Sequence, residues 1–237
     1  MKRKNIEDIK KCEGPPKVIK IFSDKEIKDI LELYYELPIT VNNKTQNIVK
    51  KRWVQNFNRS LDNLYKIKIR EALGEMQMDN LQSESGEDFL GLFHESFSPL
   101  KLHVDSGFCE TDTIFKQIVT PLTSPGETII FKNRWYDRST SFTINQEELK
   151  FKPQVGQNER SNKHIGEEEF DKEVHKKYLK HIDINNLRGM NVEFIFQWKP
   201  GETLIMDRSH IHCSSSNIIK KKIGLTTFTK KNKNLKL

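Results

Sequence analysis

The spacing of apolar residues divides the chain into a helical first part and a β-rich second part. Between Ile27 and Leu37 apolar side chains recur every three or four positions, which is the period of an amphipathic helix. Ser23 and Glu26 precede this run in the S-x-x-E form of a capping box. A second helical pattern covers about residues 60–78, whereas residues 39–59 show no regular period. We therefore expect two helices joined by an irregular segment.

From Phe89 onward the period shortens towards two, the period of β-strands. Turn sequences such as Ser-Pro-Gly at 124–126 and Lys-Pro-Gly at 199–201 separate short runs of β-prone residues. The expected strands are residues 99–104, 114–120, 127–132, 191–198, 202–207 and 222–229. Many short strands predict a mainly β fold with flanking helices, namely a double-sheet jelly roll of the cupin kind.

The domain organisation follows from the same pattern. We expect one domain over residues 1–237, because 237 residues suffice for one domain with a real core. Residues 1–92 are expected to form an N-terminal helical flank, and residues 93–229 the jelly-roll core. A charged insertion at residues 133–190 is expected to interrupt this core.

The insertion is expected to be partly helical, from about Gly166 to His181. A long insertion in a jelly roll is commonly a lid over the site or a contact between subunits of a homo-oligomer. Arg134, Trp135 and Tyr136 would be lid or pocket residues in the first case, and surface packing or a subunit contact in the second. Both alternatives stay open.

The composition predicts a folded, cytoplasmic protein. Hydrophobic residues make up 35% of the chain and the mean hydropathy is -0.70, but 14 phenylalanines are more than a disordered chain would carry. No run approaches the roughly 18 apolar residues of a membrane helix, and no apolar segment follows the basic first residues as in a signal peptide. Cys12, Cys109 and Cys213 are too widely spaced for a disulfide framework or a zinc site, which fits a reducing compartment.

The formal net charge of +7 raises the question of a nucleic-acid partner. Much of the excess lies at the two ends of the sequence, and lysines outnumber arginines heavily. The charge alone therefore favours a nucleic-acid substrate only weakly.

The tripeptide His103-Val104-Asp105 is the strongest chemical signal in the β-rich part. On a strand, His103 and Asp105 project to one side while Val104 projects to the other. Fe(II) accepts such a pair when a second histidine completes a two-histidine, one-carboxylate facial triad, which leaves open positions for substrate and oxygen.

Two places carry histidines that must be weighed for this triad. His210 and His212 follow the expected strand at residues 202–207, and either could be the second histidine. His181 and Asp183 form another H-x-D sequence, but it directly follows the expected helix, where positions i and i+2 point in different directions. We interpret it as a chance match. His94 is expected to be a surface residue or to be satisfied within the fold.

Lys222 lies ten residues after His212 and opens a strand on which Lys222, Gly224 and Thr226 share one face. A lysine that faces the interior of a barrel is costly unless it meets an anion. The alternative is that Lys222 belongs to a solvated run with Lys220 and Lys221.

Taken together, these features resemble the Fe(II)- and 2-oxoglutarate-dependent oxygenases. The likeness covers roughly residues 93–229, with the strand and helix at 18–37. Residues 121–131, PLTSPGETIIF, are similar to the stretch after the H-x-D strand in prolyl-hydroxylase-like members, and phytanoyl-CoA-dioxygenase-like members are a second comparison. The resemblance implies a double-stranded β-helix.

The resemblance also implies roles for single residues. His103, Asp105 and His212 would be the catalytic Fe(II) ligands, and Lys222 would pair with the distal carboxylate of the co-substrate 2-oxoglutarate, with O2 as the second co-substrate. Asp105 is replaced in halogenating relatives, so its presence indicates a hydroxylase. Leu100 stands where several prolyl hydroxylases carry a tyrosine.

The expected activity is that of a dioxygenase, an oxidoreductase that hydroxylates an unactivated C–H bond of a small molecule or a peptide side chain. A nucleic-acid substrate is not expected, because nucleic-acid-demethylating relatives have an R-x-N-x-T-x-R strand where this chain has Lys222, Gly224, Thr226 and Phe228. No membrane partner is expected. Two alternatives remain: a non-redox, cupin-like metal- or ligand-binding protein, and a structural or interaction module.

Overall fold

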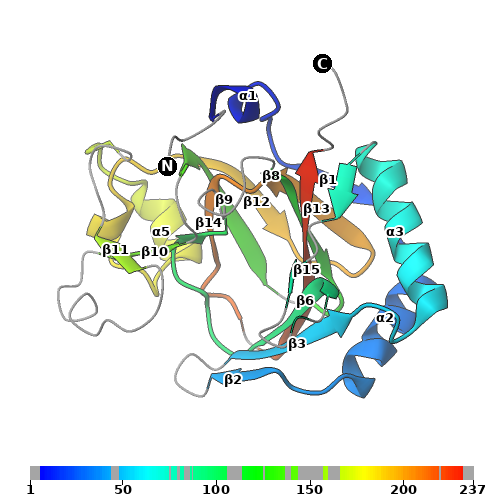
Figure 1. The fold of residues 1–237 in the computed structure, drawn as a ribbon. Coiled ribbons are helices and arrows are strands. Elements are labelled where there is room, and N and C mark those ends of the chain that lie inside the picture. Colours follow the sequence, from blue (N-terminus) through cyan, green and yellow to red (C-terminus); the bar gives the residue numbers. More distant parts are fainter. Residues whose placement is uncertain are drawn as a thin grey trace.

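The structure is a computed structural model. It describes residues 6–43, 48–74, 76–78, 81–82, 86, 88–105, 114–124, 126–136, 140–143, 157–159, 166–218 and 220–231 (Figure 1). Cys109 and parts of the expected insertion lie outside the described residues.

Two β-sheets form the centre of the molecule (Figure 1). The larger sheet has the strand order β1 (Lys17–Lys20), β13 (Glu202–Asp207), β8 (Ile114–Pro121), β15 (Lys222–Lys231), β6 (Asp88–Ser96), β3 (Ile48–Val54) and β2 (Val41–Asn43). Two short strands extend it, β4 (Met76–Met78) beside β15 and β5 (Leu81–Gln82) beside β6. The smaller sheet has the order β11 (Gln157–Glu159), β10 (Thr140–Thr143), β7 (His103–Val104), β14 (His210–Ser214), β9 (Glu127–Arg134) and β12 (Val192–Gln197).

The connections between the strands define a jelly roll. Strands β6, β8, β13 and β15 lie side by side in the larger sheet, and β7, β9, β12 and β14 in the smaller one. Along the chain these eight strands alternate between the sheets, except that β9 and β12 pair with each other. This topology confirms the predicted mainly β, cupin-like jelly roll with flanking helices.

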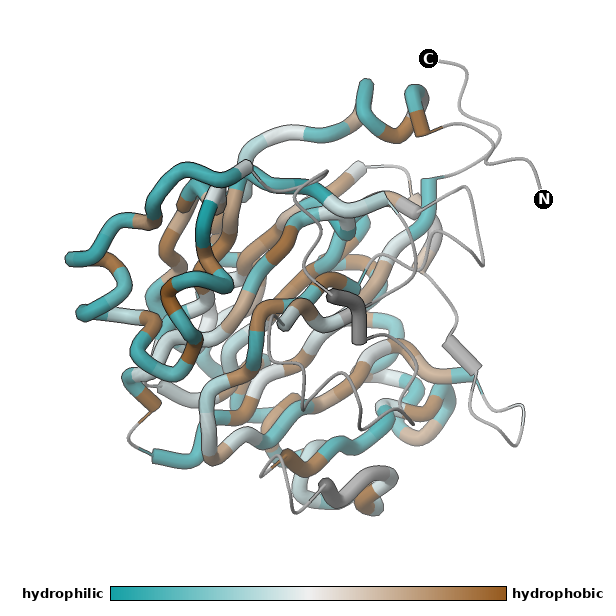
Figure 2. The backbone as a smooth tube through the Cα atoms, turned by 90° about the vertical axis from the view of Figure 1, so that its left-hand side faces the viewer, coloured by the Kyte–Doolittle hydropathy of each residue, from teal (hydrophilic) through white to brown (hydrophobic). Residues whose placement is uncertain are grey.

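Two amphipathic helices cover the outer face of the larger sheet. They are α2 (Asp24–Glu36) and α3 (Arg59–Leu73). The predicted capping box is present, because the Ser23 hydroxyl accepts from the Glu26 amide while the Glu26 carboxylate accepts from the Ser23 amide. Their buried residues pack with outward-facing residues of the sheet in one core cluster. Figure 2 shows hydrophobic segments concentrated in the central strands.

The remaining described helices are short. They are α1 (Ile6–Lys10), α5 (Lys172–Tyr178) and the 3₁₀-helix η1 (Ile184–Leu187). Among the described residues, no helix has the length and apolar character needed to cross a membrane.

The described part of the insertion that follows residue 165 covers the outer face of the smaller sheet. Leu179 and Leu187 are fully buried there and belong to one cluster with Leu102 and Val104. Because Val104 projects away from the side to which His103 projects, this part of the insertion lies behind the smaller sheet. It is therefore not a lid over the face that carries His103.

Two sequence expectations about the first part of the chain are wrong. Residues 39–59 are not irregular, since they contain β2 and β3. The second helix ends at Leu73 and not near residue 78, because Gly74 adopts a φ of 74°, a conformation that favours glycine and terminates the helix. Residues 76–78 then pair with β15 as strand β4.

Candidate metal centre and its cavity

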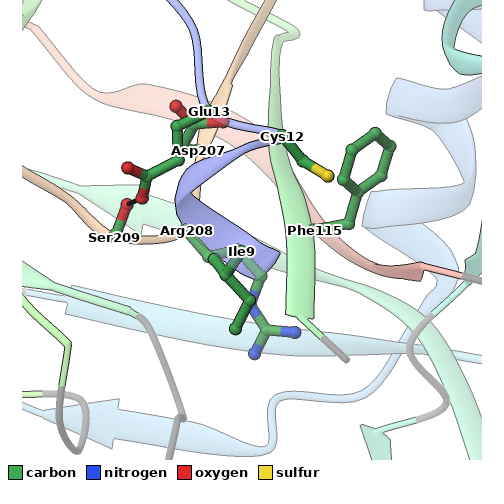
Figure 3. Close-up of a pocket in the computed structure, with 7 residues that line it drawn as sticks. All are labelled: Ile9, Cys12, Glu13, Phe115, Asp207, Arg208 and Ser209. Carbon is green, nitrogen blue, oxygen red and sulfur yellow. Dashed lines mark hydrogen bonds between the residues drawn. The ribbon is translucent and has the colours of Figure 1, made fainter. Parts of the chain in front are cut away.

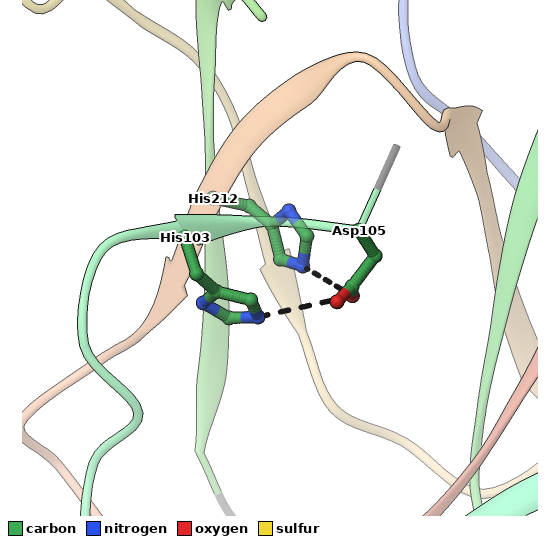
Figure 4. A group of neighbouring side chains, drawn as sticks. All are labelled: His103, Asp105 and His212. Carbon is green, nitrogen blue, oxygen red and sulfur yellow. Dashed lines mark ion pairs between the residues drawn. The ribbon is translucent and has the colours of Figure 1, made fainter. Parts of the chain in front are cut away.

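Three of the residues singled out from the sequence meet between the two sheets. His103 on β7 pairs directly opposite His212 on β14, and the two imidazole centroids are 4.2 Å apart. Asp105 follows β7 and projects to the same side as His103. One ligand atom from each of the three residues lies within 4.8 Å of the other two (Figure 4). The three donors can therefore meet at a single ion after small side-chain rotations.

Hydrogen bonds to carbonyl groups fix the tautomers of both imidazoles. Nδ1 of His103 lies 2.6 Å from the Lys101 carbonyl oxygen, and Nδ1 of His212 lies 3.0 Å from the His210 carbonyl oxygen. Because a carbonyl oxygen only accepts, each Nδ1 carries the proton and each Nε2 presents a lone pair. These Nε2 atoms lie 3.9 and 3.7 Å from Oδ2 of Asp105 (Figure 4). Three electron-rich atoms thus converge on one point.

The protonation states suit a metal. Burial, reinforced by His103, lowers the pKa of His212 to about 4, so its ring is neutral near pH 7. Burial alone would raise the pKa of Asp105, but the histidines around it and a hydrogen bond from Gln117 hold that pKa below its ordinary value. Neutral imidazoles and an ionised carboxylate are the forms that coordinate divalent metals.

Gln117 on β8 positions the carboxylate from the opposite sheet. Its Nε2 donates to Oδ2 of Asp105 at 3.0 Å. Its Oε1 is buried and has no hydrogen-bond partner among the described residues. Gln117 lines the cavity beside the triad. This buried oxygen can therefore accept a hydrogen bond from a group that enters with a ligand, such as a metal-bound water.

A cavity of about 60 Å³ extends from the triad between the sheets. Its wall includes the triad, Gln117, His94 and Lys222. By this measure one water needs roughly 10–15 Å³, so the cavity has room for several waters or for a small ligand.

Lys222 places an uncompensated cation in the wall of this cavity. Its side chain is 3% exposed, and its ammonium lies 3.5 Å from the centroid of the Trp198 ring. No carboxylate of the described residues lies within 4.0 Å of it, and Glu127, which acts on it over a longer distance, is hydrogen-bonded by Ser215 and Asn217. Burial lowers the pKa of Lys222 to about 7.

Gly224 makes the position of Trp198 possible. A Cβ atom on Gly224 would lie 2.4 Å from a carbon of the Trp198 ring, a distance that real contacts do not reach. The indole N–H donates to the Thr128 hydroxyl at 2.9 Å and so fixes the ring. The small residue between Lys222 and Thr226 on this face therefore makes room for the aromatic surface under the ammonium.

The other described histidines do not join the triad. The His181 ring lies 3.2 Å from the Leu100 carbonyl oxygen, and Asp183 caps helix η1, so the second H-x-D sequence serves packing as expected. His94 lines the cavity, which differs from the expectation of a surface or satisfied residue. One feature of the sequence indicated this position: the period of two that begins at Phe89 predicts a strand that includes His94, and this strand is β6.

His210 belongs to a separate group, here called the anchor cluster, made of Lys116, Arg134, Glu193, Asp207 and His210. Nε2 of His210 lies 3.1 Å from the Glu193 carboxylate, and its Nδ1 accepts from the Asp207 amide at 3.0 Å. Arg134 lies 3.4 Å from Glu193, and Lys116 pairs with Asp207. Each charged group in the cluster thus has a partner of opposite sign. Arg134 is consequently not a residue of the cavity wall.

Trp135 and Tyr136 also lie outside the wall of the metal cavity. Trp135 packs edge-on against Phe142 at a centroid distance of 5.3 Å. The Tyr136 hydroxyl donates to Glu13 at 2.7 Å. The idea of a pocket formed by Arg134, Trp135 and Tyr136 therefore does not hold for the described cavity.

A second, much smaller cavity lies where the N-terminal segment meets the turn between β13 and β14 (Figure 3). Ser209 donates to Glu13, and the Gly14 amide donates to Asp207 at 3.0 Å. The cavity measures about 10 Å³, which leaves room for one water at most. These contacts attach the N-terminal segment and do not form a ligand site.

Comparison with known proteins identifies the fold. No protein-family model and no curated protein sequence matches the chain. An oxidoreductase of the 2OG-Fe(II) oxygenase family from Burkholderia pseudomallei has a TM-score of 0.50 at 11% identity, over 92% of this chain and 85% of the other. The α-ketoglutarate-dependent carbocyclase SnoK from nogalamycin biosynthesis has a TM-score of 0.51 at 8% identity, over 94% of this chain and 82% of the other. The chain therefore has the fold of the Fe(II)- and 2-oxoglutarate-dependent oxygenases.

Proposed function

We propose that the protein is an Fe(II)- and 2-oxoglutarate-dependent oxygenase that hydroxylates an unactivated C–H bond of a small molecule or a peptide side chain. Succinate and CO2 would be released. One observation carries the proposal: the wall of a single cavity contains three converging metal donors and a buried cation that no carboxylate of the described residues pairs with. A bound metal would occupy the point where the three donors converge, and a dianionic co-substrate would supply the anion for the buried cation.

The donor set fits a catalytic metal better than a structural one. His103, Asp105 and His212 supply three ligands, so a six-coordinate ion keeps three positions for other groups. With 2-oxoglutarate and O2, bound Fe(II) supplies the oxidation of the C–H bond, coupled to decarboxylation of the keto acid. The presence of the Asp105 carboxylate supports hydroxylation over halogenation.

Lys222 and Trp198 would bind the co-substrate. The Lys222 ammonium pairs with the distal carboxylate, and this ion pair offsets the cost of burying the cation. The Trp198 ring fills the space beneath the ammonium and excludes water from the pair, which strengthens the attraction. An anchored co-substrate has its keto acid end fixed towards the ligands, as a preorganised site requires.

The test is succinate release by protein purified without oxygen and then supplied with Fe(II), ascorbate, 2-oxoglutarate and air. We expect succinate from the wild type and none from His212→Ala. His175→Ala, which changes a histidine on α5 behind the smaller sheet, is the matched control and should retain wild-type turnover. The visible absorption of the anaerobic Fe(II)–keto acid complex gives a second readout that does not need the substrate.

The rival function is a non-redox, cupin-like metal- or ligand-binding protein. It predicts stoichiometric iron in the wild type, no keto acid absorption band and no succinate. It also assigns no role to Lys222. That combination of results would replace the oxygenase proposal.

A further inference from the structure

Strand β3 lies beyond β6 in the larger sheet, next to the edge strand β2 (Figure 1). Lys50 on β3 pairs directly with His94 on β6, and His94 pairs with Gly224 on β15. Directly paired residues of antiparallel strands carry their side chains on the same face. Because His94 lines the cavity, Lys50 lies on the face of the sheet that bounds the cavity.

Arg52 lies two residues further along β3 and therefore on the same face as Lys50. It pairs with Leu92 of β6, which in turn pairs with Thr226, another residue of the cavity wall. Lys50 and Arg52 are both half-buried. The Arg52 guanidinium lies 5.6 Å from the centroid of the Phe89 ring.

The two cations on this face have no carboxylate partner in the part of the chain that the structure describes. Among the described residues, no carboxylate approaches Lys50 or Arg52 to within the 4.0 Å of an ion pair, although ten such pairs of a lysine or arginine with a carboxylate occur elsewhere in the described part of the chain. The residues that pair with them across β6, β15 and β8 are His94, Gly224 and Pro121 in one row, and Leu92, Thr226 and Val119 in the next. Neither row contains an acid.

The opposite face of the same strand behaves differently. Lys51 projects outward, where its ammonium donates to the Tyr34 carbonyl oxygen at 2.7 Å and lies 4.3 Å from the centroid of the Tyr34 ring. Its neighbour in the pairing, Phe93, is buried in the outer core. The outward cation of β3 is thus satisfied within the protein, whereas the two inward cations are not.

The positive charge on this face of the sheet acts on His94, which lines the cavity of the metal centre. Burial is the main cause that lowers the pKa of His94 to about 3, and Lys50, His103 and Lys222 each lower it further. His94 is therefore neutral, and the cations on this face of the larger sheet are Lys50, Arg52 and Lys222, of which Lys222 lines the cavity. Asp105 is the acid that opposes them in the cavity wall, and a bound metal would neutralise it.

We infer that the substrate carries an acidic group, a carboxylate or a phosphate, which Lys50 and Arg52 bind. The inference rests on the proposed function, in which Lys222 is occupied by 2-oxoglutarate. Strands β3 and β15 are two strand spacings apart, roughly 10 Å. A small molecule anchored on β3 can therefore reach the metal centre without displacing the co-substrate. Strand β3 is then the specificity-determining element of the enzyme.

The test compares two double variants with the same change in charge. Lys50→Gln with Arg52→Gln removes the inward cations of β3. Lys17→Gln with Lys20→Gln removes two exposed lysines of β1, at the opposite edge of the same sheet, and serves as control. Circular dichroism and thermal unfolding establish that both variants are folded.

The first readout is turnover of 2-oxoglutarate with matched compounds: carboxylic acids, their methyl esters, and phosphate monoesters. We expect acids or phosphates, and not the esters, to stimulate succinate release; the better of the two identifies the acidic group. The β3 variant should raise KM for the stimulating acid by about tenfold to a hundredfold, with kcat nearly unchanged. The β1 control should behave as the wild type. Equal stimulation by acids and their esters would overturn the inference.

The second readout needs no turnover. Protein loaded with Mn(II) and 2-oxoglutarate is mixed with inorganic phosphate, and the ³¹P relaxation rate reports how near phosphate comes to the metal. We expect enhanced relaxation in the wild type and the β1 control, and its loss in the β3 variant.

The outcomes separate the two proposals. If Mn(II) and 2-oxoglutarate bind but ³¹P relaxation is the same in all three proteins, the inference about β3 is wrong and the proposed function stands. If neither Mn(II) nor 2-oxoglutarate binds, the proposed function fails first. Tight binding of a single-stranded oligonucleotide that the β3 variant abolishes would replace the small-molecule substrate with a nucleic acid.

Discussion

Strand β14 carries two histidines two residues apart, and their surroundings differ completely. His210 belongs to the anchor cluster, where Glu193 lies against its Nε2 and the Asp207 amide donates to its Nδ1. His212 instead donates from Nδ1 to the His210 carbonyl oxygen, and its Nε2 faces Oδ2 of Asp105 at 3.7 Å. One imidazole has both nitrogens satisfied by the protein, and the other has one nitrogen aimed at a second lone pair.

This difference shows that a structural cluster and a binding site can be distinguished by whether the protein itself pairs their donors with acceptors. In the anchor cluster every negative group meets a cation or an N–H. In the metal centre three acceptors face each other, and among the described residues the cation of the cavity wall, Lys222, has no acid at ion-pair distance. Acceptors that converge with no donor between them are costly unless a cation comes between them. The first arrangement is complete without a ligand, and the second is not.

The largest expected effect is loss of the metal from the centre formed by His103, Asp105 and His212. His103→Ala removes one of the three converging donors, so iron binding and 2-oxoglutarate turnover should fall below detection. Stability without metal should change little, because the substitution removes one of the acceptors that repel each other. Iron analysis, the succinate assay and thermal unfolding of the metal-free protein test this. Retained turnover would contradict the assignment of His103.

The reverse pattern is expected in the anchor cluster. Asp207→Asn removes a buried charge that pairs with Lys116, so the free energy of unfolding should drop by about 3–5 kcal/mol. Iron stoichiometry and KM for 2-oxoglutarate should remain at wild-type values at temperatures where the variant is folded. Denaturant unfolding measures the first quantity and iron titration the second. Loss of iron without loss of stability in Asp207→Asn would contradict the distinction between the anchor cluster and the metal centre.

The substitution Lys222→Met tests the role of the buried cation in the cavity wall. We expect affinity for 2-oxoglutarate to fall by about tenfold to a hundredfold, because a charge-assisted contact is lost. The empty protein should become more stable at pH 6, where the variant no longer buries an unpaired charge. Isothermal titration and thermal unfolding report the two effects. Lys221→Met, at the neighbouring half-exposed lysine that pairs with Glu95 at 3.3 Å, is the control and should leave affinity unchanged.

The last effect is a dependence on pH, which is small near pH 7 and grows as the pH rises. Burial lowers the pKa of Lys222 to about 7 in the empty protein, so above pH 7 the ammonium loses its proton before the ligand binds. Binding of 2-oxoglutarate then takes up a proton, and affinity should fall by about tenfold per pH unit between about pH 7 and 9. Below pH 7 it should level off.

Lys222→Arg provides the control for this pH dependence, because arginine keeps its charge throughout the range. Titration calorimetry in two buffers of different ionisation enthalpy measures the proton uptake directly. An equal slope for the wild type and Lys222→Arg would assign the titration to another group.

Much of the site could be predicted because it follows the period of its strands. His103 and Asp105 are two positions apart, and so are Lys222 and Gly224, so strand geometry alone places each pair on one face. Which of His210 and His212 joins the triad could not be derived. Both lie on β14, and their register against β9 shifts between them, so the answer depends on an irregularity that sequence spacing does not encode.

Strand β3 could not be predicted for a related reason. Its sequence, IVKKRWV, carries charges on both faces, so it lacks the alternation of apolar and polar residues that reveals a half-buried strand. Lys51 is buried against Tyr34 on one side, while Lys50 and Arg52 project from the inward face of the sheet on the other. The polar pattern that hides β3 in the sequence is the one from which we infer its substrate-binding role in the fold.

The pairing of β7 with β14 has a consequence for how the protein is made. His103 and Asp105 leave the ribosome long before His212, and Lys222 follows later still. A nascent chain therefore offers iron an incomplete set of donors until β14 has been synthesised and has paired with β7. Iron uptake should thus be one of the last events of biogenesis, and the protein will acquire its metal as a nearly complete fold.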